Sequence, residues 1–138
     1  MSDSDNIAPA KKVMIVVRRA PHGTIYVHEA LEVMLIVAAY NMEVSVVFID
    51  DGVYALKKGQ DTSGLGTKAF MSAFRTLVDW EVENVYVDKS ALEARSMDIN
   101  QLTEIGVDDD TDELIMPKTL SARKIYDLMQ QQDSILSF

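Results

Sequence analysis

The chain has 138 residues, enough for one domain, and its composition (48% hydrophobic, 25% charged) is that of a globular protein. Its 22 acidic residues against 13 basic ones give a net charge of −9, which argues against direct binding to nucleic acid or an anionic membrane. It contains no cysteine, which excludes disulfides, a thiolate nucleophile and a thiolate metal site. No apolar run reaches membrane-spanning length. We therefore predict a cytoplasmic protein, with residues 1–11 as a flexible N-terminal tail and residues 12–138 as a single domain.

Strands and helices alternate along the first half of the chain. An apolar run between basic pairs predicts a buried strand over Val13–Val17, and a second strand is predicted over Val44–Ile49. The segment between them, Thr24–Asn41, is long enough for a helix, with Thr24 placed to cap its N-terminus. The stretch "VYALKKG" predicts a short helical turn that ends at Gly59.

The second half continues the alternation. We predict a strand over Glu83–Asp88, a fourth strand within Asp112–Pro117 and a last strand in "DSILSF". The acidic run Asp108–Glu113 is expected to be a solvated loop. Short helices are predicted in "KSALEARS" and "INQLTEIG", and the second begins with Asp98 and Gln101 spaced as a capping box. Two longer amphipathic helices are predicted from apolar residues at helical spacing: Phe70, Phe74, Leu77 and Val78 in the first, and Ala122, Ile125, Tyr126 and Met129 in the second.

The alternation of apolar strands with helices predicts the fold class. We expect a three-layer α/β/α domain with a mostly parallel sheet of about five strands. In such sheets, ligands bind at the carboxyl ends of the strands. Polar residues follow each of the first three predicted strands: Arg18, Arg19, His22 and Gly23; then Asp50, Asp51 and Gly52; then Asp88, Lys89 and Ser90.

These residues have two interpretations. In the first, His22 is an acid–base group and the two neighbouring arginines clamp an anion. In the second, Pro21–Gly23 turns the chain, Asp51 and Asp88 cap helices, and Gly52 permits a tight bend. We favour the second, because turns and caps are common and no nucleophile is paired with a base. No catalytic residue, metal or cofactor is therefore predicted, although Arg18, His22, Gly23, Asp51 and Asp88 are kept as candidates for a site or a subunit contact.

One predicted helix has no polar side. Residues Val33–Tyr40 read "VMLIVAAY", whereas a helix packed on one face of a sheet normally keeps a polar stripe outward. We therefore expect this segment to pack against another subunit. His28, earlier in the same helix, is expected at the surface or an interface and not as a ligand. The residues predicted at the interface are Val33, Met34, Ile36, Val37 and Tyr40.

Five stretches carry a family resemblance: "APHGT", "HEALEVML", "VVFIDDGVYALKKGQ", "FRTLVDWEVENVYVDKSALEARSMD" and "DSILSF". In this order, from about Lys12 to Phe138, they resemble the DsrF/TusC family of the DsrE/DsrF/DsrH group of intracellular sulfur-relay proteins, most of all its DsrF branch. The resemblance implies a DsrE/F-like fold and a hetero-hexamer with two copies each of three related subunits. DsrE-type and DsrH-type subunits carry sulfur as a cysteine persulfide and pass it to a DsrC/TusE-type carrier protein. This relay serves sulfur oxidation, or tRNA thiolation in the Tus branch.

The missing cysteine decides what the resemblance implies for this chain. Persulfide relay needs a thiolate, which this chain does not have. In the DsrE-type pattern the cysteine stands eight residues before the glycine of an Arg-Gly pair. Here Ser96 replaces that glycine, and counting back eight residues gives Asp88. The resemblance thus implies a non-catalytic subunit that supports transfer by its partners and touches neither nucleic acid nor membrane.

Two other functions stay open. The chain is alternatively a Tus-type subunit for tRNA thiolation. Otherwise it is a receiver-like domain whose acidic pocket of Asp50, Asp51 and Asp88 binds a metal ion or phosphate. A small hydrolase or isomerase using His22 is less favoured, because no partner base is evident.

Overall fold

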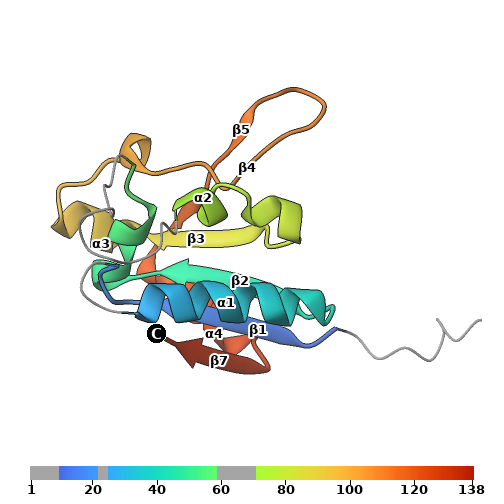
Figure 1. Cartoon of the computed structure of the whole chain (residues 1–138). Helices are drawn as coiled ribbons and strands as arrows, with labels where there is room; N and C mark the ends of the chain where they lie inside the picture. Colours follow the sequence, from blue (N-terminus) through green and yellow to red (C-terminus); the bar gives the residue numbers. More distant parts are fainter. Residues whose placement is uncertain (1–9, 22–24, 59–70) are drawn as a thin grey trace, which may run out of the picture.

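The protein folds as a five-stranded parallel sheet with helices on both faces, as expected (Figure 1). The computed structural model describes residues 10–21, 25–58 and 71–138. The sheet has the order β6–β3–β2–β1–β7, with β1 at Lys12–Val17, β2 at Glu43–Phe48, β3 at Asn84–Asp88, β6 at Lys118–Leu120 and β7 at Ser134–Ser137. The helices are α1 (Tyr26–Ala39), η2 (Asp50–Leu56), α2 (Met71–Phe74), η4 (Leu77–Trp80), α3 (Lys89–Ala94), η5 (Ile99–Gln101) and α4 (Ala122–Gln130), where η marks a 3₁₀ helix.

The apolar strands build two cores, one on each face of the sheet. Side chains alternate between faces along a strand, so Ile15 and Val17 point to one side of β1 while Met14 and Val16 point to the other. The larger core lies under α1, α2 and α3, and Phe48 meets Phe74 edge-on there with ring centroids 5.8 Å apart. The smaller core lies under α4. Both faces of the central strands are covered, which is why these strands read as continuous apolar runs.

Helix α1 covers the sheet with one side only. Its buried residues recur at helical spacing: Val27, Ala30, Leu31, Met34 and Ala38. The helix is preceded by Ile25 at the N-cap position, and the predicted cap Thr24 lies outside the described residues. None of the helices in the part of the chain described here is long and apolar enough to cross a membrane.

The predicted helix around Phe74 is broken in the structure. Phe74 and Leu77 are fully buried, as expected, but α2 ends at Phe74 and η4 begins only at Leu77. Between them, both the backbone N–H and the hydroxyl of Thr76 donate to the carbonyl of Ala73, each at 3.1 Å. A hydroxyl that bonds a preceding carbonyl competes with the helical ladder, which accounts for the break. Phe70 lies outside the described residues.

The other predicted helices are present with changes. The turn predicted in "VYALKKG" is the 3₁₀ helix η2, which begins earlier, at Asp50, and ends at Leu56, while Gly59 lies outside the described residues. The second predicted short helix is only the 3₁₀ turn η5, but its capping box of Asp98 and Gln101 is present. Helix α4 has Ile125 buried and Met129 partly buried, whereas Ala122 and Tyr126 are exposed and do not belong to its packed face.

The fourth predicted strand is present but does not belong to the main sheet. Leu114 and Ile115 form β5, which pairs antiparallel with β4 (Gly106–Val107) in a separate hairpin that projects from the body (Figure 1). The outer strand of the main sheet is β6, directly after Pro117. The acidic run Asp108–Glu113 forms the exposed tip of the hairpin, as expected of a solvated loop. The Asp108 carboxylate accepts the backbone N–H groups of Asp110 and Thr111 and so orders this tip.

Gly52 holds η2 against the first strand. A Cβ atom at this position would overlap the backbone carbonyl of Val17, so any side chain would push η2 away from β1. Gly106 is also tight, because an added Cβ would lie 2.7 Å from the Cβ of Val78, but its obstacle is a side chain.

These two glycines allow a matched test of backbone contact. We expect Gly52→Ala to lower the free energy of unfolding by about 3 kcal/mol, because backbone cannot yield as a rotamer can. Gly106→Ala should cost about 1 kcal/mol, since Val78 can shift. Urea unfolding followed by circular dichroism measures both. Equal losses of unfolding free energy for the two variants would mean that the contact of Gly52 with the Val17 backbone is no more restrictive than the contact of Gly106 with the Val78 side chain.

Candidate functional site

The candidate residues lie at one edge of the sheet. Strands β1, β2 and β3 are parallel neighbours, so Arg18, Asp51 and Asp88 all follow carboxyl ends at that edge. His22 and Gly23, which were predicted beside them, lie outside the described residues. Each remaining side chain either stabilises the fold through bonds within the chain or is free to contact a ligand.

Asp88 caps a helix, as predicted. Its carboxylate accepts the Ser90 backbone N–H at 3.1 Å and the Ser90 hydroxyl at 2.8 Å, at the start of α3. Both bonds come from residues directly after the strand, so the interaction is local and explains why an acid is favoured here.

Asp51 does not cap a helix. The residue before η2 is Ile49, and the Asp51 carboxylate instead accepts two hydrogen bonds from the Arg95 guanidinium, at 2.9 and 3.1 Å. Arg95 also donates to the carbonyl of Ala91 at 3.1 Å and lies 6.0 Å from the ring centroid of Tyr54. The ion pair ties η2 to the end of α3. Sequence reasoning missed Arg95, because nothing local signals a partner 44 positions away.

The two arginines after β1 have different partners. Arg18 donates from Nε to the Ser137 hydroxyl at 2.9 Å, while its backbone N–H donates to the Phe138 carbonyl. The Arg19 guanidinium stacks over the Tyr26 ring at 3.8 Å from its centroid. Because the two groups turn toward β7 and α1 respectively, they do not form the anion clamp of the first interpretation.

The acidic residues that the structure describes do not gather into a metal site. Among residues 10–21, 25–58 and 71–138, no three His, Asp or Glu side chains are close enough together to hold one ion. Asp51 is bonded to Arg95 and Asp88 to Ser90, so two of the three acids in the receiver-like hypothesis are already engaged.

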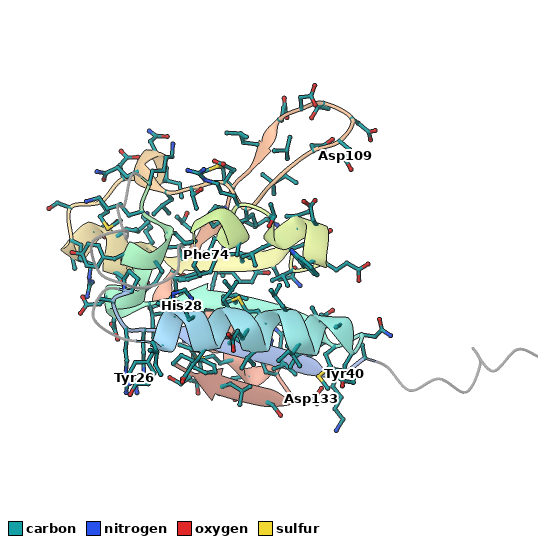
Figure 2. The ribbon with its side chains drawn as sticks, in the orientation of Figure 1. Tyr26, His28, Tyr40, Phe74, Asp109 and Asp133 are labelled. Atoms are coloured by element: carbon teal, nitrogen blue, oxygen red, sulfur yellow. The ribbon has the colours of Figure 1, made fainter. Side chains whose placement is uncertain are left out.

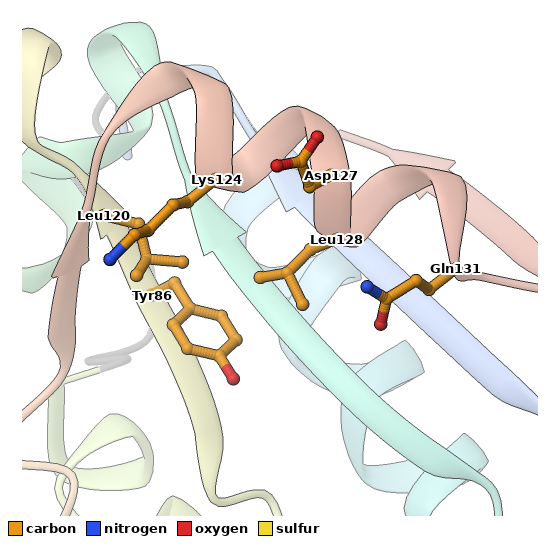
Figure 3. Close-up of a pocket in the computed structure, with 6 residues that line it drawn as sticks. All are labelled: Tyr86, Leu120, Lys124, Asp127, Leu128 and Gln131. Carbon is orange, nitrogen blue, oxygen red and sulfur yellow. The ribbon is translucent and has the colours of Figure 1, made fainter.

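A shallow groove of about 310 Å³ lies elsewhere, on the α4 face of the sheet (Figure 3). Tyr86 of β3 and Leu120 of β6 form its floor, and Lys124 and Asp127 of α4, with Gln131 directly after the helix, lie along one side. None of the predicted site residues lines it.

The outer side of α1 is apolar in its C-terminal half, whereas Glu29 and Glu32 are exposed in its N-terminal half. Ile36 is 56% exposed and Tyr40 73%, and Val33 and Val37 are partly buried at its flanks. Met34, which was predicted at the interface, is fully buried in the core of this chain and cannot contact another subunit. His28 is partly buried on the first turns of the same helix (Figure 2).

With this geometry in place, similarity to known proteins identifies the family. A model described as the DsrE/DsrF-like family matches residues 11–138. The chain belongs to this family. It is 46% identical over 131 residues to the intracellular sulfur oxidation protein DsrF of Allochromatium vinosum, covering 93% of this chain and 96% of that protein. It is 30% identical over 121 residues to a TusC homologue of Vibrio parahaemolyticus, covering 88% and 93%.

The fold also has a solved counterpart. The crystal structure of the YchN protein from E. coli superposes with a TM-score of 0.68 at 19% identity, covering 93% of this chain and 99% of that one. At this identity the likeness concerns the fold alone.

Ser96 fits the DsrE/DsrF-like pattern in its backbone. The resemblance places a glycine at this position in cysteine-bearing relatives, and Ser96 adopts a left-handed φ of 53° directly after α3. Glycine adopts that conformation without a steric cost. A glycine would therefore fit at position 96 without strain, while the count of eight residues back to Asp88 stays a prediction.

Asp88→Cys tests this alignment. We expect the new thiol to react with alkylating reagents in the native protein, because Asp88 is only partly buried and the Ser90 N–H and hydroxyl would face the thiolate. Loss of the cap should cost about 1 kcal/mol. The control is Ser45→Cys, whose side chain is buried inside the sheet and should resist the reagent. Equal protection of both thiols would mean that the two loops are not equivalent.

Proposed function

We propose that this chain is a cysteine-free, non-catalytic subunit of a sulfur-relay complex. Its partners are DsrE-type and DsrH-type paralogues that carry persulfides, two copies of each subunit assemble, and the sulfur passes to a DsrC/TusE-type carrier. The observation that carries the proposal is the 46% identity to DsrF over nearly the full length of both chains.

The residue chemistry of the chain favours a non-catalytic role in sulfur transfer. A persulfide forms on a thiolate, and the chain has no cysteine. At the position that corresponds to the reactive cysteine of relatives, Asp88 carries a negative charge and bonds Ser90. A carboxylate there would repel a persulfide anion, so this edge of the sheet stabilises the fold and does not store sulfur.

Sulfur oxidation is favoured over tRNA thiolation. The identity to DsrF is 46%, against 30% to the TusC homologue, over similar lengths. A receiver-like metal or phosphate site is disfavoured, because Asp51 pairs with Arg95 and Asp88 caps α3.

The outer side of α1 is proposed as the contact with a paralogous subunit. Ile36 and Tyr40 are exposed there, and no charged residue follows Glu32 within the helix. An apolar helix face of this kind is typical of a surface that is covered in an assembly.

Sulfur loading tests the non-catalytic role. The complex of this chain with its two cysteine-bearing paralogues is treated with polysulfide, and intact masses are measured for each subunit. We expect the paralogues to gain the mass of one or more sulfur atoms and this chain to gain none, because it has no thiolate. The Asp88→Cys variant is the positive control for detection on this chain. Covalent sulfur on the wild-type chain would refute the proposal.

Ile36→Glu tests the α1 contact. A carboxylate buried in an apolar contact without a partner is strongly unfavourable, so co-purification with the paralogues should fall by about tenfold or more. Ala122→Glu adds the same charge at an exposed position on the first turn of α4 and should leave the complex intact. The proposed contact is wrong if both variants co-purify like the wild type.

A further inference from the structure

The two edges of the sheet differ in how well they are protected. At one edge, β6 follows Pro117 and begins with the exposed Lys118, and proline and lysine are devices that discourage further strand pairing. At the other edge, β7 reads Ser-Ile-Leu-Ser, with neither charge nor proline. Ile135 is 46% exposed and Leu136 40%. Within the described chain β7 pairs only with β1, so its outer side is open.

The ladder to β1 fixes which backbone groups are open. Phe138 donates its N–H to the Val16 carbonyl at 2.8 Å and accepts the Arg18 N–H at 2.9 Å, so both its groups face β1. Alternate residues of a strand face the same neighbour, so Leu136 also faces β1, and Ile135 and Ser137 face outward. The open edge therefore offers two donors and two acceptors.

We infer that β7 pairs antiparallel with β7 of a second copy of this chain, around a two-fold axis at Leu136. In this register Ile135 of each copy lies opposite Ser137 of the other. The four outward donors and four outward acceptors of the two copies then form four hydrogen bonds. The axis is normal to the sheet, so α1 of both copies stays on the same face and each opposed pair of side chains shares a face. The five-stranded sheet becomes one sheet of two copies.

Charges at the ends of β7 suit this pairing. Asp133 precedes the strand and accepts the Lys12 backbone N–H at 2.8 Å, whereas Arg18 lies at the other end, bonded to the Ser137 hydroxyl. Both are exposed. The two-fold axis brings Asp133 of each copy next to Arg18 of the other. The acidic tip Asp108–Glu113 projects from the opposite side of the molecule, so the strongest like charges stay apart (Figures 1 and 2).

This inference is independent of the sulfur-relay proposal, because it uses only this chain. It assigns Arg18, which has no catalytic role, to a contact between copies. Ile36 points away from the sheet on α1, so the contact proposed for a paralogue remains open in the dimer.

Cross-linking tests the pairing directly, since the natural chain has no cysteine to interfere. At the axis the two Leu136 Cα atoms form a non-hydrogen-bonded pair about 4.5 Å apart, which is within the range of a disulfide. Leu136→Cys should therefore give a disulfide-linked homodimer on mild oxidation, visible on a non-reducing gel. Thr119→Cys, on the protected edge, is the matched control and should stay monomeric. Absence of the Leu136→Cys homodimer overturns the inference. So does a mixed disulfide with a co-expressed paralogue in place of the homodimer.

Charge reversal tests the register. Arg18→Asp and Asp133→Arg should each weaken dimerisation by about tenfold, because like charges then meet at both ends of the strand pair. The double variant should restore the dimer, measured by sedimentation velocity with circular dichroism to confirm folding. The two residues lie at opposite ends of β7 in one chain, so rescue requires contact between copies. Ile36→Glu should leave this dimer unchanged, which separates a failure here from a failure of the paralogue contact. A double variant as weak as the single ones would exclude this register.

Discussion

The last strand of the chain pairs with the first, and the rest of the molecule depends on this pairing. Because β7 takes the outer place beside β1, the first strand becomes an interior strand with hydrogen bonds on both sides. An interior strand is buried on both faces, which is why Val13–Val17 is apolar throughout. The pairing also sets Arg18 next to Ser137 and leaves the short neutral strand β7 at the edge.

The described side chains at the carboxyl edge of the sheet are held by hydrogen bonds within the chain. In a related chain, a cysteine at the position of Asp88 would need an open approach and a nearby positive charge. Here the Asp88 carboxylate accepts hydrogen bonds from Ser90, and the Arg95 guanidinium at the end of α3 is paired with Asp51. The loop after β3 is thus held by its own hydrogen bonds. This is how a subunit can keep the shape of its relatives while another chain carries the chemistry.

Many elements of the fold could be predicted from the sequence. Those that could not be predicted depend on contacts between residues far apart in the chain or on competition between local interactions. Strands β1, β2, β3 and β7, the capping box at Asp98 and the cap at Asp88 all depend on residues close together in the chain. The Arg95–Asp51 pair depends on two loops meeting through the sheet, and no local pattern announces it. The helix breaks after Phe74 where the Thr76 hydroxyl bonds the Ala73 carbonyl, which the apolar periodicity of the segment did not indicate. The hairpin of β4 and β5 was mistaken for part of the main sheet because an apolar pair of strand residues reads alike in either setting.

The protection of β6 by Pro117 and Lys118 has a consequence for the size that an assembly can reach. A sheet grows without limit only when each added copy offers a second open edge. With one edge closed to pairing, any association through the other ends after one step and gives a closed particle, not a fibre. Pro117 and Lys118 therefore limit how far association through strand edges can extend.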